Sequence, residues 1–286
     1  MNRALVIGAT GNVGTEVVSQ LTVRGARVRA LTRNPHATRF PPQVEAVRGD
    51  LTVPETLDEC LEGVDAVFLL WSAPPSTAAA VLERIANHAK RIVFLSSPHK
   101  TAHPFFQAGQ PNPMAALQAQ VERLIANSGL EWTILRPGIF AANARFWWAS
   151  QIRAGDVVRW PYASAPTAPI HQQDIAAVAV RALCEDGHAG AEYLLTGPQS
   201  LTQAEQVQTI GTVIGRPLRM EEISPDDARR ESLSLMPLFV ANMLLNAWAA
   251  ALGQPALVTS TVREITGTPA RTFSEWATDH AADFRP

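Results

Sequence analysis

The stretch ALVIGATGNVG, residues 4–14, decides the fold of this chain. Four apolar residues run directly into three spaced glycines, Gly8, Gly11 and Gly14, and a helix-like segment at 15–23 follows. Glycines at this spacing allow a tight turn, a close approach of backbone to a pyrophosphate, and close packing of the next helix on the sheet. That helix presents unpaired N–H groups and its positive dipole end at its start. The stretch therefore predicts a dinucleotide site; the alternative is a tight strand–helix turn that holds no ligand.

The composition is that of a globular protein with a substantial core: 286 residues, 47% hydrophobic and 17% charged. A net charge of −2 provides no basic field for nucleic acid, so we expect no nucleic-acid partner. The two cysteines, Cys60 and Cys184, lie in helix-like segments, which predicts no disulfide and fits a cytoplasmic protein. The chain enters its first strand at once and leaves no room for a signal peptide.

The longest apolar run, residues 235–252, is interrupted by Pro237, Asn242 and Asn246. These interruptions favour a buried or pocket-covering helix over a membrane span. We therefore expect no membrane partner, and a monomer or homodimer that acts on a small molecule. We expect no metal site.

Strand and helix signals alternate through the first half of the chain, as in a doubly wound α/β protein with a parallel sheet. The predicted strands are short and rich in Val, Ile, Leu or Phe, and lie at 4–7, 27–32, 44–48, 66–70, 91–95 and 132–135. Helices are predicted between them, at 15–23, 55–61, 77–88 and 113–128. Residues 1–137 are thus expected to form a dinucleotide-binding Rossmann core.

The pattern loosens after Pro137. A helix is predicted at 173–184, a strand at 192–195 and a further helix at 202–214. We expect residues 138–286 to form a smaller, mostly helical region over the carboxyl edge of the sheet, partly returning to the core so that the two make one integrated unit. Since doubly wound proteins bind ligands at that edge, this region is predicted to form the substrate pocket.

Two charged residues follow the second and third predicted strands. Arg33 occupies the place where an NAD-binding protein carries an acidic residue, and a guanidinium there suits a 2′-phosphate. Arg33 therefore favours NADP(H) over NAD(H); the alternative is a solvated surface arginine. Asp50 either receives the adenine amino group or caps the approach to the next helix.

Several motifs together resemble the NmrA-like branch of the atypical short-chain dehydrogenase/reductases, whose glycine turn also has the form G-x-x-G-x-x-G. They lie at 8–14, 31–33, 49–51, 135–138 and 174–176, with weaker matches at 195–198, 215–217 and 272–276. The resemblance implies a Rossmann fold and an NAD(P) cofactor. The cofactor contacts expected on this basis are Gly8, Thr10, Gly11, Asn12, Val13, Gly14, Arg33, Asp50, Leu51, Leu70, Trp71, Ser96, Pro137 and Gly138.

The resemblance is less informative about the reaction, because the family holds quinone and phenylpropanoid reductases, epimerase-like proteins and redox-sensing regulators. Active members of the wider superfamily carry Tyr and Lys four residues apart on the helix after the fifth strand, as proton donor and its partner. Those positions here are Met114 and Gln118, so the usual pair is absent. Gln118 retains the capacity to hydrogen-bond a ribose or a substrate carbonyl.

Replacements for the missing pair are found in the loop after the fifth strand. Ser96 or Ser97 matches the superfamily's active-site serine or threonine, and His99, Lys100 and His103 follow. We take Ser97, His99, Lys100 and Gln118 as catalytic candidates; the alternative is an ordinary solvated loop.

Aromatic residues gather after the sixth predicted strand. The expected substrate pocket consists of His103, Phe140, Asn143, Trp147 and Trp160, whose rings would hold a planar apolar ligand; core packing is the alternative. The sequence thus favours an NADP(H)-dependent reductase of a hydrophobic carbonyl, enone or quinone-like compound. A dinucleotide-sensing regulator without turnover, and a non-redox isomerase, cyclase or lyase, are the other hypotheses.

Overall fold

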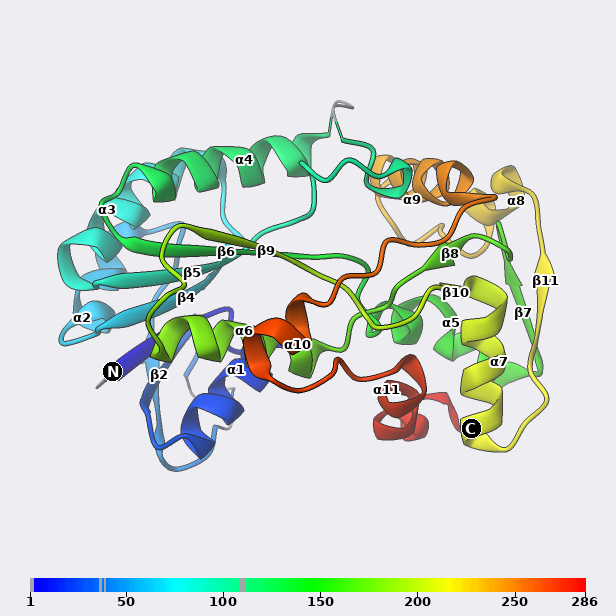
Figure 1. Cartoon of the computed structure of the whole chain (residues 1–286), viewed down its shortest axis with the longest axis horizontal. Helices are drawn as coiled ribbons and strands as arrows, with labels where there is room; N and C mark the ends of the chain where they lie inside the picture. The colour runs from blue at the N-terminus through cyan, green and yellow to red at the C-terminus, as the bar shows by residue number, and fades with distance from the viewer. Residues whose placement is uncertain (1–2, 36–37, 39, 109–111) are drawn as a thin grey trace.

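The computed structural model describes residues 3–35, 38, 40–108 and 112–286. Its centre is a parallel sheet of seven strands in the order β3-β2-β1-β4-β5-β6-β9 (Figure 1). The order reverses direction between β1 and β4, which makes their carboxyl ends the switch point where doubly wound sheets bind ligands. The strands are β1 (Arg3–Ile7), β2 (Arg27–Thr32), β3 (Val44–Arg48), β4 (Ala66–Leu70), β5 (Arg91–Leu95), β6 (Glu131–Pro137) and β9 (Ala191–Leu195).

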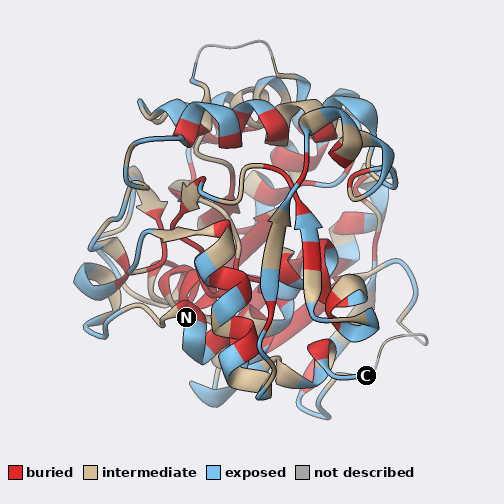
Figure 2. Ribbon diagram, turned by 90° about the vertical axis from the view of Figure 1, so that its right-hand side faces the viewer, coloured by how far each residue is buried: buried red, intermediate tan, exposed pale blue. Residues whose placement is uncertain are grey.

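Helices cover both faces of this sheet, so the predicted doubly wound fold is confirmed. One face carries α1 (Asn12–Val23) and α6 (Gln172–Cys184), with α10 (Thr261–Thr266) packed on α6. The other face carries α2 (Asp58–Leu61), α3 (Ala78–His88) and α4 (Pro113–Ala126). Figure 2 shows the buried residues concentrated between these layers and the exposed residues on the outer faces of the helices.

Helix α3 shows why the sequence folds in this way. Its buried residues, Ala78, Val81, Leu82 and Ile85, recur at helical spacing and form one apolar stripe against the sheet. The strands beside it, such as β4, are covered on both faces and are accordingly apolar throughout. The apolar stripe of the helices and the apolar strands between them produce the layered arrangement. Because the strands are parallel, their carboxyl ends lie at one edge of the sheet.

The second half of the chain adds elements beyond that edge (Figure 1). It also returns to the sheet, since β9 pairs with β6 and α6 packs against α1. Two small sheets that the sequence did not predict join β7 (Val157–Trp160) to β11 (Arg219–Glu222) and β8 (Pro166–Thr167) to β10 (Leu201–Thr202). The helices of this half are α5 (Asn143–Ala154), α7 (Gln203–Ile214), α8 (Pro225–Arg230), α9 (Leu238–Ala251) and α11 (Phe273–Asp279). Short 3₁₀ turns lie at η1 (Pro54–Leu57), η2 (Pro75–Thr77), η3 (Pro104–Phe106) and η4 (Ala281–Phe284).

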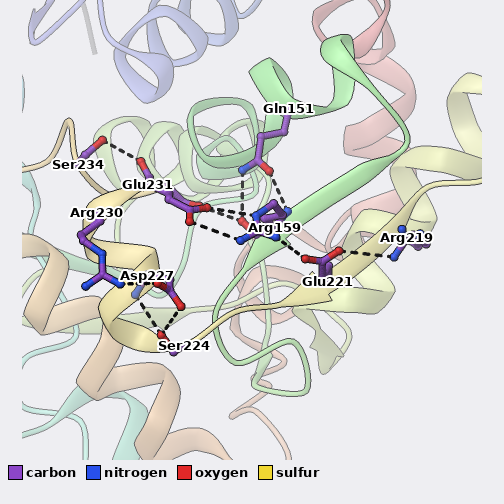
Figure 3. A network of polar contacts seen from close by, with 10 residues as sticks. Gln151, Arg159, Arg219, Glu221, Ser224, Asp227, Arg230, Glu231 and Ser234 are labelled. Atoms are coloured by element: carbon purple, nitrogen blue, oxygen red, sulfur yellow. Dashed lines mark hydrogen bonds and ion pairs between the residues drawn. The ribbon is translucent and has the colours of Figure 1, made fainter.

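A surface network of polar side chains ties α5, β7 and β11 to the segment after α8 (Figure 3). Gln151 exchanges two hydrogen bonds with the backbone of Arg159. The Arg159 guanidinium pairs with Glu221 on β11 and with Glu231 after α8. These ion pairs are partly exposed, so they add little to stability, and their role is to fix the relative positions of the elements.

The apolar run at 235–252 contains α9, as predicted. Within the part of the chain that the structure describes, no helix has both the length and the apolar character needed to cross a bilayer.

Candidate cofactor and substrate site

The glycine turn has the geometry that its spacing predicts. Gly8 follows β1 with φ +89°, in the left-handed region that favours glycine, and its carbonyl accepts the Gly11 N–H at 3.0 Å. A Cβ at Gly14 would lie 2.0 Å from the Gly8 oxygen, and one at Gly8 would lie 2.9 Å from the Leu70 Cβ. The helix therefore starts in close contact with the turn, and only glycine permits this.

The first turn of α1 fits an anionic group. Gly11 is the N-cap residue, and no described side chain caps the helix. The first N–H groups of the helix have no intrahelical carbonyl partner, and the helix dipole favours a negative charge there. Thr10 and Asn12 are exposed beside this turn, whereas Val13 is buried beneath it. The backbone around Gly11–Gly14 thus fits a dinucleotide pyrophosphate.

Two arginines lie at the ends of the neighbouring strands β2 and β3. Arg33 is exposed directly after β2, and Arg48, which the sequence reasoning missed, is exposed at the end of β3 in register with Thr32. Arg48 could have been found from the sequence, because parallel pairing of the predicted strands 27–32 and 44–48 places it beside the end of the first strand. Asp50 accepts hydrogen bonds from the Thr52 N–H and hydroxyl, both at 2.8 Å, so it caps its own turn. The hydrogen bond from the Thr52 backbone N–H is the main reason that the pKa of Asp50 lies below its usual value. The positive charge of Arg33 lowers this pKa further.

The other expected cofactor residues lie along the same edge. Leu51 is buried, and the Trp71 indole is also buried and donates to the Ala73 carbonyl at 2.7 Å. Pro137 ends β6, and the Gly138 N–H donates to the Leu195 carbonyl at 2.8 Å, which joins β6 to the end of β9.

A cavity of about 440 Å³ opens at the carboxyl ends of β5 and β6. Its volume is in the range of small-molecule sites. Ser97 and His99 line it from the loop after β5, and Met114 and Ala115 line it from the first turn of α4. The rest of the wall is Pro98, Phe105, Phe106, Gln107, Asn112, Pro113, Ile139, Phe239, Asn242, Met243, Leu244, Asn246 and Ala247.

A buried ion cluster lies behind this loop. Glu122 on α4 is 3% exposed and binds the Arg136 guanidinium at 2.6 Å, the Lys100 Nζ at 2.9 Å and the Ser96 hydroxyl at 2.5 Å. Arg136 also pairs with Glu192 on β9 at 2.9 Å. Burial raises the pKa of Glu122, but the hydrogen bonds from Arg136, Ser96 and Lys100 outweigh it and leave the pKa below its usual value.

This cluster separates the catalytic candidates. Lys100 is held by Glu122 and does not line the cavity, whereas Ser97 and His99 do. The His99 Nδ1 lies 3.2 Å from the Ser97 hydroxyl, and its Nε2 lies 3.7 Å from Glu122. Burial is the main cause that lowers the pKa of His99. The positive charges of Arg136 and Lys100 lower it further, and the negative charge of Glu122 raises it, without outweighing the other effects. His99 is therefore a neutral imidazole at neutral pH.

The two positions that replace the usual Tyr/Lys pair behave differently. Met114 lines the cavity, but Gln118, one turn later on α4, is not among its lining residues. The Gln118 Oε1 is buried without a hydrogen-bond partner among the described residues. Neither side chain is an acid near neutral pH.

Of the five expected pocket residues, none lines the large cavity. His103 lines a small neighbouring cavity of about 20 Å³, and Phe140 and Asn143 lie where β6 leads into α5. Trp147 and Trp160 are 7% and 0% exposed, and pack with Trp148 and Trp248 at ring-centroid distances of 5.5–6.1 Å. The Trp160 indole donates to Gln203 at 2.8 Å. These tryptophans form the core of the second region, because pairing of β7 with β11 turns Trp160 inward.

The sequence did not predict the residues that line the large cavity instead of the five expected ones. The second wall of the cavity comes from Phe105, Phe106 and the α9 face with Phe239, Asn242 and Met243. The sequence did carry one signal for this wall: Asn242 and Asn246 lie one helical turn apart within an apolar run. Two polar residues at this spacing indicate that one face of the helix is not buried in the core, and this is the face that lines the cavity.

The glycine turn, the uncapped helix and the switch-point edge define a Rossmann-type dinucleotide-binding protein. Residues 8–186 match the family model described as NAD(P)H-binding. The chain is 38% identical over 289 residues to (4-alkanoyl-5-oxo-2,5-dihydrofuran-3-yl)methyl phosphate reductase of Streptomyces griseus, covering 99% of each chain. It is 34% identical over 288 residues to the NAD(P)H azoreductase of Xenophilus azovorans, covering 98% of each. The solved triphenylmethane reductase of Citrobacter sp. complexed with NADP(H) shares the fold, with a TM-score of 0.80, 19% identity, and coverage of 98% of this chain and all of that one.

The chain therefore belongs to the NAD(P)H-binding family. Binding of NAD(P)H follows from this membership, and the cradle around Gly8 and Gly14 fits it.

Proposed function

We propose that this protein is an NADPH-dependent reductase of a hydrophobic, ring-containing carbonyl, enone or quinone-like compound, acting without a Tyr/Lys pair. The observation that carries the proposal is the cavity of about 440 Å³ at the ends of β5 and β6. It lies on the edge of the sheet where the glycine turn places the cofactor. Two relatives that match nearly the whole chain are named as reductases, which supports the reaction class.

The preference for NADPH rests on Arg33 and Arg48. Both are exposed at the ends of neighbouring strands, where the adenosine ribose binds in this fold. An arginine engages a phosphate through two parallel hydrogen bonds, and a second positive charge nearby adds to the attraction. Asp50 is already occupied by Thr52, so it acts as the cap of its turn.

NADPH, when bound, supplies a hydride to an electron-poor carbon. The residues of this chain contribute binding, orientation and exclusion of water. Phe105, Phe106 and Phe239 present flat apolar surfaces to the cavity. Since Met114 stands in the proton-donor position, the substrate must tolerate a proton taken from water or from a cavity donor, as activated enones and quinones do.

A matched pair of variants tests whether the cavity is the reaction site. Ala115 lines the cavity, and the next residue on α4, Ala116, is exposed. Ala115→Trp places an indole in the cavity and is expected to abolish NADPH oxidation by quinones, cyclic enones and aromatic aldehydes, while Ala116→Trp retains it. NADPH binding, followed by fluorescence, should survive in both. Equal turnover in the two variants, or no substrate-dependent oxidation by the unmodified protein, contradicts the proposal.

A dinucleotide sensor is the second candidate. Its supporting observation is that Lys100 is ion-paired with Glu122 and does not line the cavity, which leaves His99 as the titratable side chain that lines it among the described residues. NADPH binding without turnover across the whole substrate panel is the result that favours it.

A further inference from the structure

Two buried nitrogen atoms of the large cavity have no hydrogen-bond partner among the residues that the structure describes. The Nε2 atoms of His99 and Gln107 are buried, and neither has a hydrogen-bond partner among the described residues. Both residues line the cavity of about 440 Å³. Buried polar groups in proteins are almost always paired, so two orphans at one cavity require an explanation.

The contacts of His99 favour the tautomer with the proton on Nε2. Its Nδ1 lies 3.4 Å from an Arg136 nitrogen, which can only donate, and 3.2 Å from both the hydroxyl and the backbone carbonyl of Ser97. That carbonyl already accepts an N–H of Arg136 at 3.1 Å, so it does not require a proton on Nδ1. A lone pair on Nδ1 suits the Arg136 nitrogen and the Ser97 hydroxyl, and the proton is then on Nε2. Glu122, 3.7 Å from Nε2, favours the same tautomer but lies beyond hydrogen-bond distance.

Gln107 is held in an unusual backbone conformation. It ends the η3 turn with φ 50° and ψ 42°, in the left-handed region that side chains other than glycine rarely adopt. Its N–H donates to the Pro104 carbonyl at 3.2 Å, which closes the turn. Strained residues of this kind cluster at ligand sites, and here the strain occurs at a cavity residue with an unpaired donor.

The remaining wall is largely apolar and aromatic. Phe105 and Phe106 pack edge to face at 5.4 Å, and α9 contributes Phe239, Met243 and Leu244. Two other polar side chains of the wall are engaged: the Asn112 Oδ1 caps α4, and the Asn242 Oδ1 accepts a hydrogen bond from Arg229 at 2.8 Å. The cavity thus combines an apolar wall with two donors that need an acceptor.

We propose that His99 and Gln107 recognise the substrate by donating hydrogen bonds to its carbonyl oxygen, and that the substrate class is an apolar ring compound bearing such oxygens. This inference rests on the proposed function and adds its specificity residues. A neutral His99 donates without placing a charge in the cavity. A compound of the same shape without acceptor oxygens leaves both donors unpaired and is rejected.

Binding without turnover tests the inference. The probes are 2,3-dimethyl-1,4-naphthoquinone and 2,3-dimethylnaphthalene, which share an apolar ring system but differ in the two oxygens. Calorimetric titration of the NADP⁺-saturated protein is expected to show clearly tighter binding of the quinone. His99→Phe and Gln107→Leu should each weaken quinone binding by about 10-fold, the cost of one unmade hydrogen bond, and leave hydrocarbon binding unchanged.

Matched controls and a rescue variant keep the test specific. His88 and Gln208 are exposed away from the cavity, so His88→Phe and Gln208→Leu should bind both probes as the unmodified protein does. His99→Gln retains an N–H donor and should recover part of the quinone preference. Equal affinity of the unmodified protein for the two probes, no measurable quinone binding, or unchanged binding in both cavity variants overturns the inference. Failure of the proposed function shows separately, as quinone binding without NADPH oxidation.

Discussion

Gly14→Ala is the perturbation that most sharply tests the cofactor site. The new Cβ would lie 2.0 Å from the Gly8 oxygen and 2.7 Å from the Gly8 carbon, both backbone atoms that cannot rotate away. Real Cβ contacts are essentially never below 3.0 Å, so the start of α1 or the turn must move by about 1 Å, the difference between 3.0 and 2.0 Å. Such a shift misplaces the N–H groups that face the pyrophosphate.

The expected loss follows from the number of bonds affected. A hydrogen bond to a charged group contributes about 1.5–3 kcal/mol, so losing one weakens NADPH binding by roughly 10- to 150-fold. Overpacking at the turn also lowers the free energy of unfolding by about 1–3 kcal/mol. Fluorescence titration with NADPH measures the first effect, and urea unfolding the second.

Gly155→Ala is the control. A Cβ at Gly155 would meet no heavy atom within 4 Å, and its φ of −176° is extended backbone that any residue adopts. Gly155 follows α5, outside the glycine turn, so we expect this variant to bind NADPH as the unmodified protein does. A folded Gly14→Ala protein that binds NADPH as well as Gly155→Ala does would refute the reasoning.

Three further predictions concern the cofactor, the ion cluster and the core. Arg33→Asp should weaken NADPH binding by roughly 10-fold or more and NADH binding far less, by fluorescence titration; equal losses contradict the 2′-phosphate assignment. Glu122 has a lowered folded pKa, so its contribution to stability is present above pH 4.5 and is lost as the pH falls below that value; urea unfolding across pH 3–7 should show a shallower acid loss in Glu122→Gln. Trp160→Phe leaves the Gln203 oxygen unpaired and should cost about 1–3 kcal/mol of stability without changing the KM for a quinone; a large KM change would assign Trp160 to the pocket instead.

The fold could be predicted from the sequence because its signals are local. The strands of the large sheet are short apolar runs, and helix α3 shows its stripe within 11 residues. The sheet also brings the chain ends of β1, β2 and β4 to one edge without any further information. For the cofactor, the glycine spacing, Arg33 and the family resemblance predict contacts along that edge, and these contacts stay predictions.

The rest of the site depends on long-range packing. Glu122 and Arg136 are 14 residues apart and meet Lys100 only because α4 packs on β5 and β6. No local pattern shows that Lys100 forms an ion pair with Glu122.

The aromatic residues illustrate the same limit. Trp147 and Trp160 follow the sixth strand, as a pocket roof would, yet they pack against Trp248 from a helix about 90 residues further on. The cavity is lined instead by Phe239 and Met243 of α9, whose apolar run had indicated a buried or pocket-covering helix without indicating which cavity it covers.

The most direct test of the central claim is a single-turnover experiment under anaerobic conditions. The NADPH-saturated protein is mixed with 2,3-dimethyl-1,4-naphthoquinone, and the absorbance of the reduced nicotinamide is followed together with the hydroquinone formed. We expect one hydroquinone for each NADPH oxidised, and the loss of both signals in Ala115→Trp. NADPH that stays reduced while the quinone occupies the cavity would contradict the proposed reaction.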